Sequence, residues 1–406
     1  MGLMENNKAQ AKNMQEYIEC RRSDNNAISL KGRINSFNAP MAEKALNDLC
    51  KETQDVILDC EELEYTASSG LRIFLAMSKK HRMTLVNVQP AVYEVLELSG
   101  LTSIMDVHKA FRIVSLEGCE VIGEGANGIV YRLDPETVIK VFRQKDALLD
   151  IERERNLART ALILGIPTAI AYDTVRVPDG RYGAVYEMLA SKSYAKLLKA
   201  KEKTVDEIAD MSVQLLRIIH AAEAQPEVLP SMKQIALGRV EEIRPYLSTG
   251  ECERLKSFID SLADSRHLLH GDFHIKNVHW NNGESILLDM FTLCTGDPLF
   301  ELAGVYYTYR SFADLDPDNA VGFLGITPQE AFGLCDQIIE KYYADRSEQP
   351  AAAYDGIRMI AYCRLLRFTL KASHYDSQFR EKQIRHCQKM ISVYLDRIYG
   401  TQQEDS

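Results

Sequence analysis

The pattern of the sequence changes near residue 111, and this change constrains the fold more than any other feature. Residues 17–107 alternate short apolar, β-branched segments with segments rich in Ala, Leu, Lys and Glu, which is typical of strands alternating with helices. The rest of the chain begins with strand-like segments and becomes mostly helical after about residue 203. Because 406 residues are too many for one ordinary core, we expect two or three domains.

The first part of the chain is expected to fold as a small α/β domain. Strands are predicted at residues 27–32, 55–60 and 83–88, and helices at residues 40–52, 69–80 and 90–100. Pro90 near the start of the last helix and Gly100 just after its end are typical helix boundaries. A sheet covered by these helices would form a domain at residues 15–110, preceded by a flexible tail at residues 1–14.

Charge and cysteine usage exclude several classes of protein. The chain has 48 Lys and Arg against 58 Asp and Glu, a formal net charge of -10, so it lacks the basic excess that neutralises nucleic-acid phosphates. Its nine cysteines form no CxxC pair, which favours reduced thiols over a zinc site or a redox dithiol. No apolar run approaches the ~18 residues of a membrane helix. We therefore expect a cytoplasmic protein that binds neither nucleic acid nor membranes.

A glycine-rich segment near the start of the second part has the order GxGxxGxV, with Gly123, Gly125, Gly128 and Val130. Backbone without side chains can approach a phosphate closely and present N–H donors, although an ordinary glycine-rich hairpin has the same pattern. Lys140 lies twelve residues beyond Gly128 between apolar strand residues. This is the place of a phosphate-contacting lysine; the alternative is an edge-strand lysine whose ammonium group reaches solvent.

A long helix is predicted at residues 145–164. Glu154 falls on the same side of this helix as Ile151, whereas Glu152 lies about 200° around the axis. An acid on the inward face needs a cation, and Lys140 on the preceding strand would supply it. Glu152 is expected on the solvated face.

The stretch HLLHGDFHIKN contains Asp272 and Asn277, which are separated by four residues. Such a pair can hold a substrate hydroxyl with the first residue and a metal ion with the second, and Asp289 at the end of an apolar strand would be a second Mg²⁺ ligand. The stretch also contains three histidines, His267, His270 and His274. A zinc site is the alternative that they leave open, but oxygen ligands dominate the neighbourhood, and hydrogen bonds from His270 to the loop backbone are the favoured interpretation.

Residues 117–400 resemble the protein-kinase-like fold in its aminoglycoside phosphotransferase and choline kinase branch. That branch writes its catalytic loop HGDxxxxN, and this chain has HGDFHIKN. The segment GDPLFELA at residues 296–303 is similar to GDPxxDLA, with Glu301 in place of the usual Asp, and DMF stands where protein kinases have DFG. The resemblance implies a two-lobed α+β domain.

The same resemblance implies ATP as a cofactor. Residues 123–128 would cover its phosphates. Lys140 would contact the α- and β-phosphates while Glu154 holds it in place. A strand is predicted that ends with the residues VYE. The backbone of Glu187 and Leu189, at and just after the end of this strand, would meet the adenine ring.

The resemblance also implies a Mg²⁺ ion and a hydroxyl acceptor. Asp272 would act as a base or an orienting group for that hydroxyl. Asn277 and Asp289 would hold the Mg²⁺ ion, which bridges the phosphates and offsets developing charge. The identity of the acceptor stays open. A catalytic loop of this kind favours the hydroxyl of a small molecule, whereas the presence of a second, N-terminal domain in the same chain favours signalling and a protein serine.

Two serines, Ser68 and Ser69, lie where the helix of residues 69–80 should begin. One interpretation is helix capping, which Ser performs routinely. The other is phosphorylation, because free N–H groups and the helix dipole stabilise a phosphate at this position. Both interpretations are compatible with a folded domain.

The segment around these serines resembles the STAS domain of bacterial anti-sigma-factor antagonists, over about residues 15–108. The stretches that carry the resemblance are LKGRINSFNAP, VILDCEELEYTASSGLRIFL and LVNVQPAVYEVLELSGL. In that family the serine that matches Ser68 is phosphorylated by a partner kinase, although Ala67 here replaces the aspartate of sporulation-type members. The resemblance thus implies a protein partner and a phosphorylation site at Ser68.

Two functions fit the sequence. The first is an ATP- and Mg²⁺-dependent phosphotransferase that carries a STAS domain for regulation or partner binding. The second is a non-catalytic, nucleotide-binding signalling adaptor that acts through STAS partner switching. Because a degenerate kinase usually loses at least one of its five key residues, their retention favours the enzyme. These residues are Lys140, Glu154, Asp272, Asn277 and Asp289.

Overall fold

The computed structural model describes residues 17–22, 27–51, 53–125, 127–225, 227–344 and 351–400, with the backbone alone at 351 and 352. The tail expected at residues 1–14 lies outside these residues. The chain divides into two compact units, the first formed by residues up to 115 with 174–180 and the second by residues 116–173 and 181–406. We describe each unit by itself.

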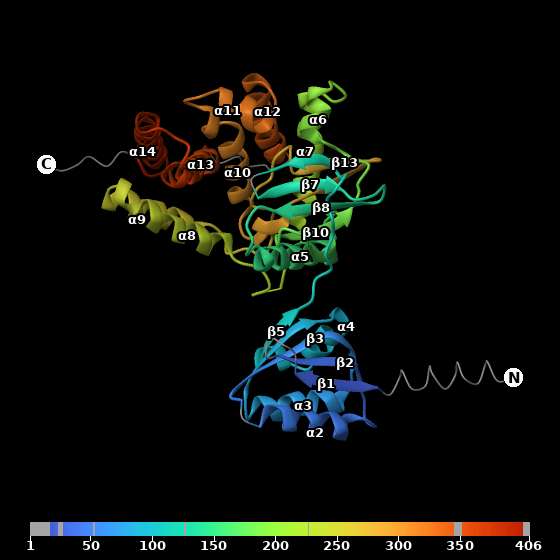
Figure 1. The fold of residues 1–406 in the computed structure, drawn as a ribbon. Coiled ribbons are helices and arrows are strands. Elements are labelled where there is room, and N and C mark those ends of the chain that lie inside the picture. The colour runs from blue at the N-terminus through green and yellow to red at the C-terminus, as the bar shows by residue number, and fades with distance from the viewer. Residues whose placement is uncertain are drawn as a thin grey trace. The chain divides into compact units, whose positions relative to one another are not determined.

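The first unit is built on one sheet with the strand order β1-β2-β3-β4-β5 (Figure 1). β1 is antiparallel to β2, and the other three pairings are parallel. The strands are β1 (Ile18–Arg22), β2 (Ile28–Ile34), β3 (Asp55–Thr66), β4 (Arg82–Val88) and β5 (Asp106–Lys109). Parallel neighbours need crossover connections, which α2 (Ala39–Cys50), α3 (Ser68–Ser78) and α4 (Pro90–Leu98) provide. The predicted α/β fold is confirmed.

Each helix of this unit buries one apolar face against the sheet. Leu46 of α2, Phe74 of α3 and Leu96 of α4 are fully buried. They share one core with strand residues such as Leu58 and Leu85. α2 and α3 lie side by side (Figure 1), so the start of α3, where Ser68 stands, is fixed by the packing of both.

A second five-stranded sheet has the order β6-β7-β8-β10-β9. Its strands are β6 (Glu120–Glu124), β7 (Gly128–Arg132), β8 (Thr137–Phe142), β9 (Ala171–Arg176) and β10 (Tyr182–Glu187), and α5 (Leu148–Ile163) follows β8. β8 pairs antiparallel with both β7 and β10. It is therefore an inner strand, and its side chains lie at the centre of the sheet.

The rest of the second unit is mainly helical and packs around one large core. Its helices are α6 (Tyr194–Lys199), α7 (Val205–Ala221), α8 (Met232–Ile243), α9 (Thr249–Ser261), α10 (Pro298–Tyr309), α11 (Asp318–Leu324), α12 (Pro328–Tyr343), α13 (Ala351–Lys371) and α14 (Ser377–Tyr399), with short 3-10 turns η3 (Met290–Thr292) and η4 (Ser311–Ala313). The predicted plan, a β-rich part followed by a helical part, is confirmed.

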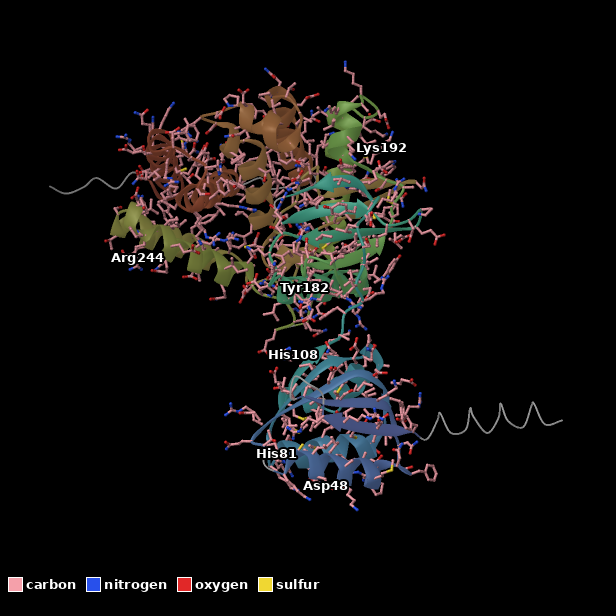
Figure 2. All side chains as sticks on the ribbon, in the orientation of Figure 1. Asp48, His81, His108, Tyr182, Lys192 and Arg244 are labelled. Carbon is pink, nitrogen blue, oxygen red and sulfur yellow. The ribbon has the colours of Figure 1, made fainter. Side chains whose placement is uncertain are left out.

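Two small sheets within this helical part carry the loops of interest. One has the order β11-β13-β14 and the other pairs β12 with β15. Their strands are β11 (Lys192–Ser193), β12 (Leu268–Leu269), β13 (Val278–Asn281), β14 (Glu284–Leu287) and β15 (Cys294–Thr295). Lys192, labelled in Figure 2, pairs with Trp280 of β13. The loop of residues 270–277 connects β12 to β13, and the segment of residues 288–293 connects β14 to β15.

Sequence reasoning missed the short strands β11, β12, β13 and β15 and three longer ones, β1, β5 and β9. All three are edge strands, and β1 and β5 bury few of their side chains. An edge strand with one exposed side needs fewer apolar residues, so its pattern is weak. β3 is longer than predicted, because it runs on to Thr66 instead of ending at residue 60.

Two further features concern the cysteines and the length of the helices. All nine cysteines are free thiols. In the part of the chain that the structure describes, no helix has the length and apolar character needed to cross a membrane.

Gly70 in the first turn of α3 offers a test of the packing beneath Ser68. A Cβ at this position would lie 2.2 Å from Thr66 Oγ1 and 2.9 Å from Ile34 Cγ2. We predict that Gly70→Ala lowers the free energy of unfolding of the first unit by about 1–3 kcal/mol, because overpacking outweighs the better helix propensity of Ala. Urea denaturation, monitored by hydrogen exchange of residues 55–66, measures this free energy of unfolding.

Ser69→Ala is the matched control for this substitution. The Ser69 hydroxyl is buried without a partner among the described residues, so its removal should leave stability unchanged or slightly higher. Equal stability of Gly70→Ala and wild type would contradict the packing described here.

Candidate active site

A buried ion pair joins β8 to α5. The Nζ atom of Lys140 lies 3.1 Å from Oε1 and 3.0 Å from Oε2 of Glu154. Lys140 stands opposite Val130 on β7 and Ala184 on β10, so it is on an inner strand. The edge-strand interpretation of Lys140 is therefore wrong, and the predicted pairing with Glu154 is confirmed.

Glu154 is buried with Ile151 on the inward face of α5, whereas Glu152 is exposed. Burial raises the pKa of Glu154; the charge of Lys140 lowers it, and the charge of Asp289 raises it further. Asp289 therefore lies within electrostatic reach of the ion pair although it is far away in sequence. Removing Lys140 would leave a buried carboxylate without its counter-charge.

Direct packing also links α5 to the segment after Asp289. α5 contacts η3, and the guanidinium carbon of Arg153 lies 4.9 Å from the ring centroid of Phe291. The ion pair and the 288–293 segment thus belong to one site within the second unit.

The glycines of the GxGxxGxV segment serve different purposes. A Cβ on Gly128 would lie 2.4 Å from the carbonyl oxygen of Val141, so this glycine is required by the close pairing of β7 with β8. A Cβ on Gly125 would meet nothing within 4 Å, and the Gly125 N–H donates to Gly128 O at 2.9 Å. Gly123 lies opposite Val130 in the β6–β7 hairpin. Ala126 at the tip lies outside the described residues.

The two residues expected to meet adenine lie at the end of the sheet. Glu187 is the last residue of β10, and Leu189 belongs to the connection that leads to β11. The Leu189 carbonyl accepts a hydrogen bond from the Ser191 N–H at 2.8 Å, and the Met188 N–H donates to Glu136 O at 2.7 Å. Contact of these backbone groups with adenine stays a prediction.

The 270–277 loop is held in one conformation by its neighbours. Gly271 has φ +79°, and a Cβ there would lie 2.7 Å from the carbonyl oxygen of Thr292, so only glycine fits. The Thr292 hydroxyl donates to His270 O at 2.7 Å. The buried carboxylate of Glu301 in α10 accepts the N–H groups of both His270 and Gly271.

Asp272 emerges from this loop with two cationic or potentially cationic neighbours. Arg364 of α13 donates from Nη2 to Asp272 Oδ1 at 2.9 Å and from Nη1 to Gly271 O at 3.0 Å, and His274 Nε2 lies 3.5 Å from Asp272 Oδ2. Burial raises the pKa of Asp272, but the hydrogen bond from His274 and the charge of Arg364 outweigh it and hold the pKa below its usual range. The group is therefore a carboxylate at neutral pH, a weak base and a good hydrogen-bond acceptor.

Asn277 and Asp289 connect the loop to the 288–293 segment. The Asn277 side chain donates from Nδ2 to Asp272 O at 3.1 Å, and the main-chain carbonyl of Asn277 accepts the Leu288 N–H at 2.8 Å. Asp289 has φ +63°, a left-handed conformation that costs about 1–3 kcal/mol for a residue other than glycine. His270 Nε2 lies 2.8 Å from Asp289 O, as its predicted role in the loop backbone requires.

The donor set fits a hard divalent cation. Among the residues that the structure describes, no donor bonds to Asn277 Oδ1 or to the Asp289 carboxylate, and such oxygens are what Mg²⁺ prefers. The histidines do not form a zinc site: no group of three or more His, Cys, Asp or Glu within the described ranges could hold a metal ion. His270 faces backbone carbonyls and His274 faces Asp272 instead.

Sequence reasoning missed two residues of this site. Glu301 received no role, although its place in the GDPLFELA segment was the available signal; burial raises its pKa while its contacts with the loop oppose that rise. Arg364 lies in a helical segment with nothing local to distinguish it from Arg367, and only the packing of α13 brings it to Asp272.

Ser68 is the first residue of α3 and is exposed. The N-cap position belongs to Ala67, and no side chain caps this helix. The capping interpretation of Ser68 is therefore wrong, and its hydroxyl is accessible at a helix N-terminus.

Two family models match the chain. The STAS domain model matches residues 17–113, and the model of the phosphotransferase enzyme family matches residues 118–330, slightly more than half of the chain. BtrV of Bordetella bronchiseptica, a candidate anti-sigma factor antagonist, is 38% identical over 84 residues, which cover 19% of this chain and 72% of BtrV.

Solved structures of aminoglycoside phosphotransferases are similar at low identity. The apo form of a thermostable mutant of APH(4)-Ia is 13% identical, with 70% of this chain and 98% of that chain covered and a TM-score of 0.48. ADP-bound APH(2'')-Ib is 14% identical, with 69% and 94% covered and a TM-score of 0.45. By the match of the family models, this chain belongs to the phosphotransferase enzyme family and carries a STAS domain at its N-terminal end.

Proposed function

We propose that this chain is an ATP- and Mg²⁺-dependent phosphotransferase that transfers a γ-phosphoryl group to a hydroxyl acceptor. The observation that carries the proposal is the proximity of Asp289, with its segment packed on α5, to the buried Lys140–Glu154 pair. Membership of the phosphotransferase enzyme family supports this activity. The STAS domain supports regulation or binding of a protein partner.

The proposed mechanism gives each side chain one task. Lys140 binds the α- and β-phosphates, and Glu154 fixes its ammonium group. Asn277 and Asp289 would hold a Mg²⁺ ion, which when bound would offset charge on the phosphates. Asp272 accepts a hydrogen bond from the acceptor hydroxyl and orients it. Because the pKa of Asp272 is held low, rate enhancement comes from positioning and electrostatics.

The position of Ser68 supports a switch in the STAS domain. A phosphate on the first residue of α3 would meet free N–H groups and the positive end of the helix dipole. The exposed hydroxyl is accessible to a kinase. We infer that Ser68 carries a regulatory phosphate and that a protein partner distinguishes the two states.

Substitution of the two aspartates tests the enzyme. We predict that Asp272→Asn and Asp289→Asn each reduce Mg²⁺-dependent ATP turnover by at least about 100-fold, because each removes a charge that acts on the reacting groups. Coupled detection of ADP measures turnover, and chelation of Mg²⁺ should abolish it in wild type. Asp206→Asn, which changes a surface ion pair with Lys341, is the control and should retain activity.

The Lys140–Glu154 pair is tested by nucleotide affinity. We predict that Glu154→Gln weakens ATP binding by about tenfold, a loss of about 1.4 kcal/mol, because a neutral amide no longer fixes the Lys140 ammonium. Titration calorimetry with ATP and Mg²⁺ measures the affinity. Glu152→Gln, two residues away on the exposed side of α5, should change it by less than about threefold.

The same two experiments separate the enzyme from the adaptor. An adaptor that only binds nucleotide would lose affinity in Glu154→Gln, yet its wild type would not turn over ATP with any hydroxyl acceptor. Equal turnover in wild type and both aspartate variants would show that the assigned site is wrong.

Charge reversal at Ser68 tests whether the helix favours a phosphate. We predict that Ser68→Asp is more stable than Ser68→Lys by about 0.6–2 kcal/mol at low salt, since an anion is stabilised and a cation destabilised at a helix N-terminus. Chemical denaturation at low and high salt measures the difference, which should shrink as salt screens it. A more stable Lys variant would contradict the switch.

A further inference from the structure

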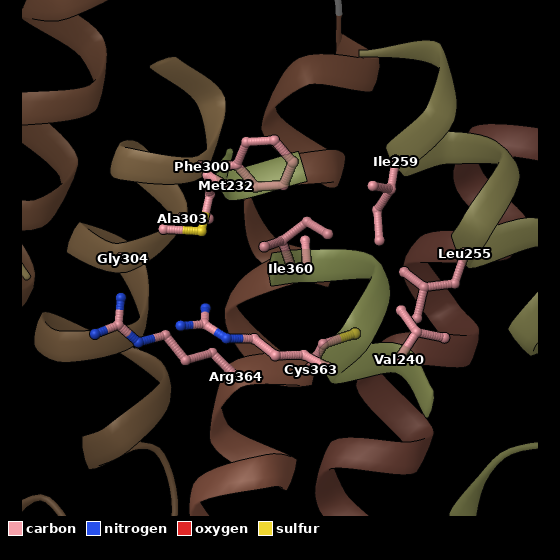
Figure 3. Close-up of a pocket in the computed structure, with 12 residues that line it drawn as sticks. Met232, Val240, Leu255, Ile259, Phe300, Ala303, Gly304, Ile360, Cys363 and Arg364 are labelled. Atoms are coloured by element: carbon pink, nitrogen blue, oxygen red, sulfur yellow. The ribbon is translucent and has the colours of Figure 1, made fainter. Parts of the chain in front are cut away.

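A small cavity lies between α8, α9, α10 and α13, and one of its lining residues, Arg364, is bound to Asp272. It has a volume of about 30 Å³ and a lining that is apolar apart from two arginines, Arg239 and Arg364. Figure 3 shows Arg364 beside Gly304 of α10, with the apolar side chains gathered away from it. A Cβ on Gly304 would lie 3.0 Å from Arg364 Nη1, so this glycine makes room for the guanidinium group.

Some N–H donors of Arg364 form no hydrogen bond with the described residues. Its bonds to Gly271 O and Asp272 Oδ1 use one N–H of each terminal nitrogen, whereas a guanidinium group has five N–H donors. The remaining donors have no acceptor within the described part of the chain. The ring of Tyr307 lies against the same group, with its centroid 4.8 Å away.

Arg239 is half-buried, and it forms no hydrogen bond or ion pair with the described residues. Burial lowers its pKa, and the charges of Arg364 and Arg367 lower it further, to about 10, so it is still a cation at neutral pH. The nearby acid Glu242 is already bound by Arg367, at 2.9 Å, and by Lys371.

The lining of the cavity therefore carries an excess of positive charge. Arg239 and Arg364 line it, and no carboxylate is among its lining residues. Asp272 offsets the charge of Arg364 at 2.9 Å, whereas Arg239 has no ion pair within the described part of the chain. A partly buried cation without a counter-charge is unfavourable, and an anion from outside the protein would offset it.

We propose that the acceptor is an anionic alcohol, whose carboxylate or phosphate group binds Arg239 and the unused donors of Arg364 at this cavity. Arg364 contacts Asp272 on its other side, so an anion held here brings a hydroxyl a few atoms away to the Asp272 carboxylate. The inference rests on the proposed function and names the substrate class of that site.

The chain also has an acidic run, FADLDPDN, at residues 312–319, and the negative charge of such a run would suit a cationic acceptor. Asp314 is bound by the Tyr362 hydroxyl and by His386, whose Nε2 atom lies 2.9 Å away. Asp316 accepts the backbone N–H of Asp318 at 3.2 Å. These acids thus serve local structure, and the arginines near Asp272 are the groups with bonding capacity left.

Matched acceptors test the proposal in the full-length chain with ATP and Mg²⁺. The panel compares glycerate with its amide, glycerol phosphate with glycerol, a hexose phosphate with the free hexose, and choline as a cationic alcohol. We expect at least a tenfold higher kcat/KM for the anionic member of a pair, and the carboxylate and phosphate pairs show which anion is preferred. Arg239→Gln should remove most of this preference, whereas Arg367→Gln, whose partner is Glu242, should preserve it.

A readout without turnover separates this inference from the proposed function. The thermal midpoint should rise with the anionic panel members in wild type and in Arg367→Gln, but not in Arg239→Gln. If no acceptor is phosphorylated and the Arg239-dependent rise is present, the anion site stands and the phosphotransferase proposal fails. If the best acceptor is neutral or cationic, or if no anion gives an Arg239-dependent rise, the anionic acceptor is overturned.

Discussion

The candidate site depends on one buried carboxylate, that of Glu301. It is almost fully inaccessible and accepts the N–H groups of His270 and Gly271, which would otherwise lie unsatisfied at the start of the loop. A buried charge is costly unless hydrogen bonds compensate it. The Glu301 carboxylate of α10 therefore needs the N–H groups of the loop, and the loop needs this carboxylate as their acceptor. This anchor fixes the direction in which the chain leaves β12 and therefore where Asp272 points.

The 288–293 segment is held in place by hydrogen bonds from the 270–277 loop. His270 contacts the carbonyl groups of Leu288 and Asp289, and the Asn277 carbonyl binds the Leu288 N–H. These bonds hold Asp289 in a left-handed conformation that an isolated chain would avoid. In this conformation Asp289 lies within electrostatic reach of Glu154. Groups from three distant segments of sequence are brought together by backbone hydrogen bonds more than by contacts between their own side chains.

The sequence predicted what local periodicity and spacing can encode. The inward position of Glu154 follows from helical geometry, and its pairing with Lys140 follows from the need of a buried acid for a cation. Edge strands such as β1 and β5 were missed because one-sided exposure weakens their pattern. Arg364 was missed for a different reason: its helix has no distinctive local signal, and its role arises only when α13 packs beside the loop. The placement of adenine-contacting backbone stays a prediction, since backbone roles leave no mark on side-chain type.

Arg364 connects two features of this site, the low pKa of Asp272 and the positive charge of the nearby cavity. The hydrogen bond from His274 and the charge of Arg364 lower the pKa of Asp272 and make it a weaker base, which would be a disadvantage if the aspartate had to remove a proton early. In a loose phosphoryl-transfer transition state the hydroxyl needs orientation more than deprotonation, so the disadvantage is small. The same guanidinium group offers its unused donors to the cavity that Arg239 lines. In the function that we propose, an arginine that weakens the base would therefore still favour the reaction, because it would place the acceptor against the carboxylate that it holds.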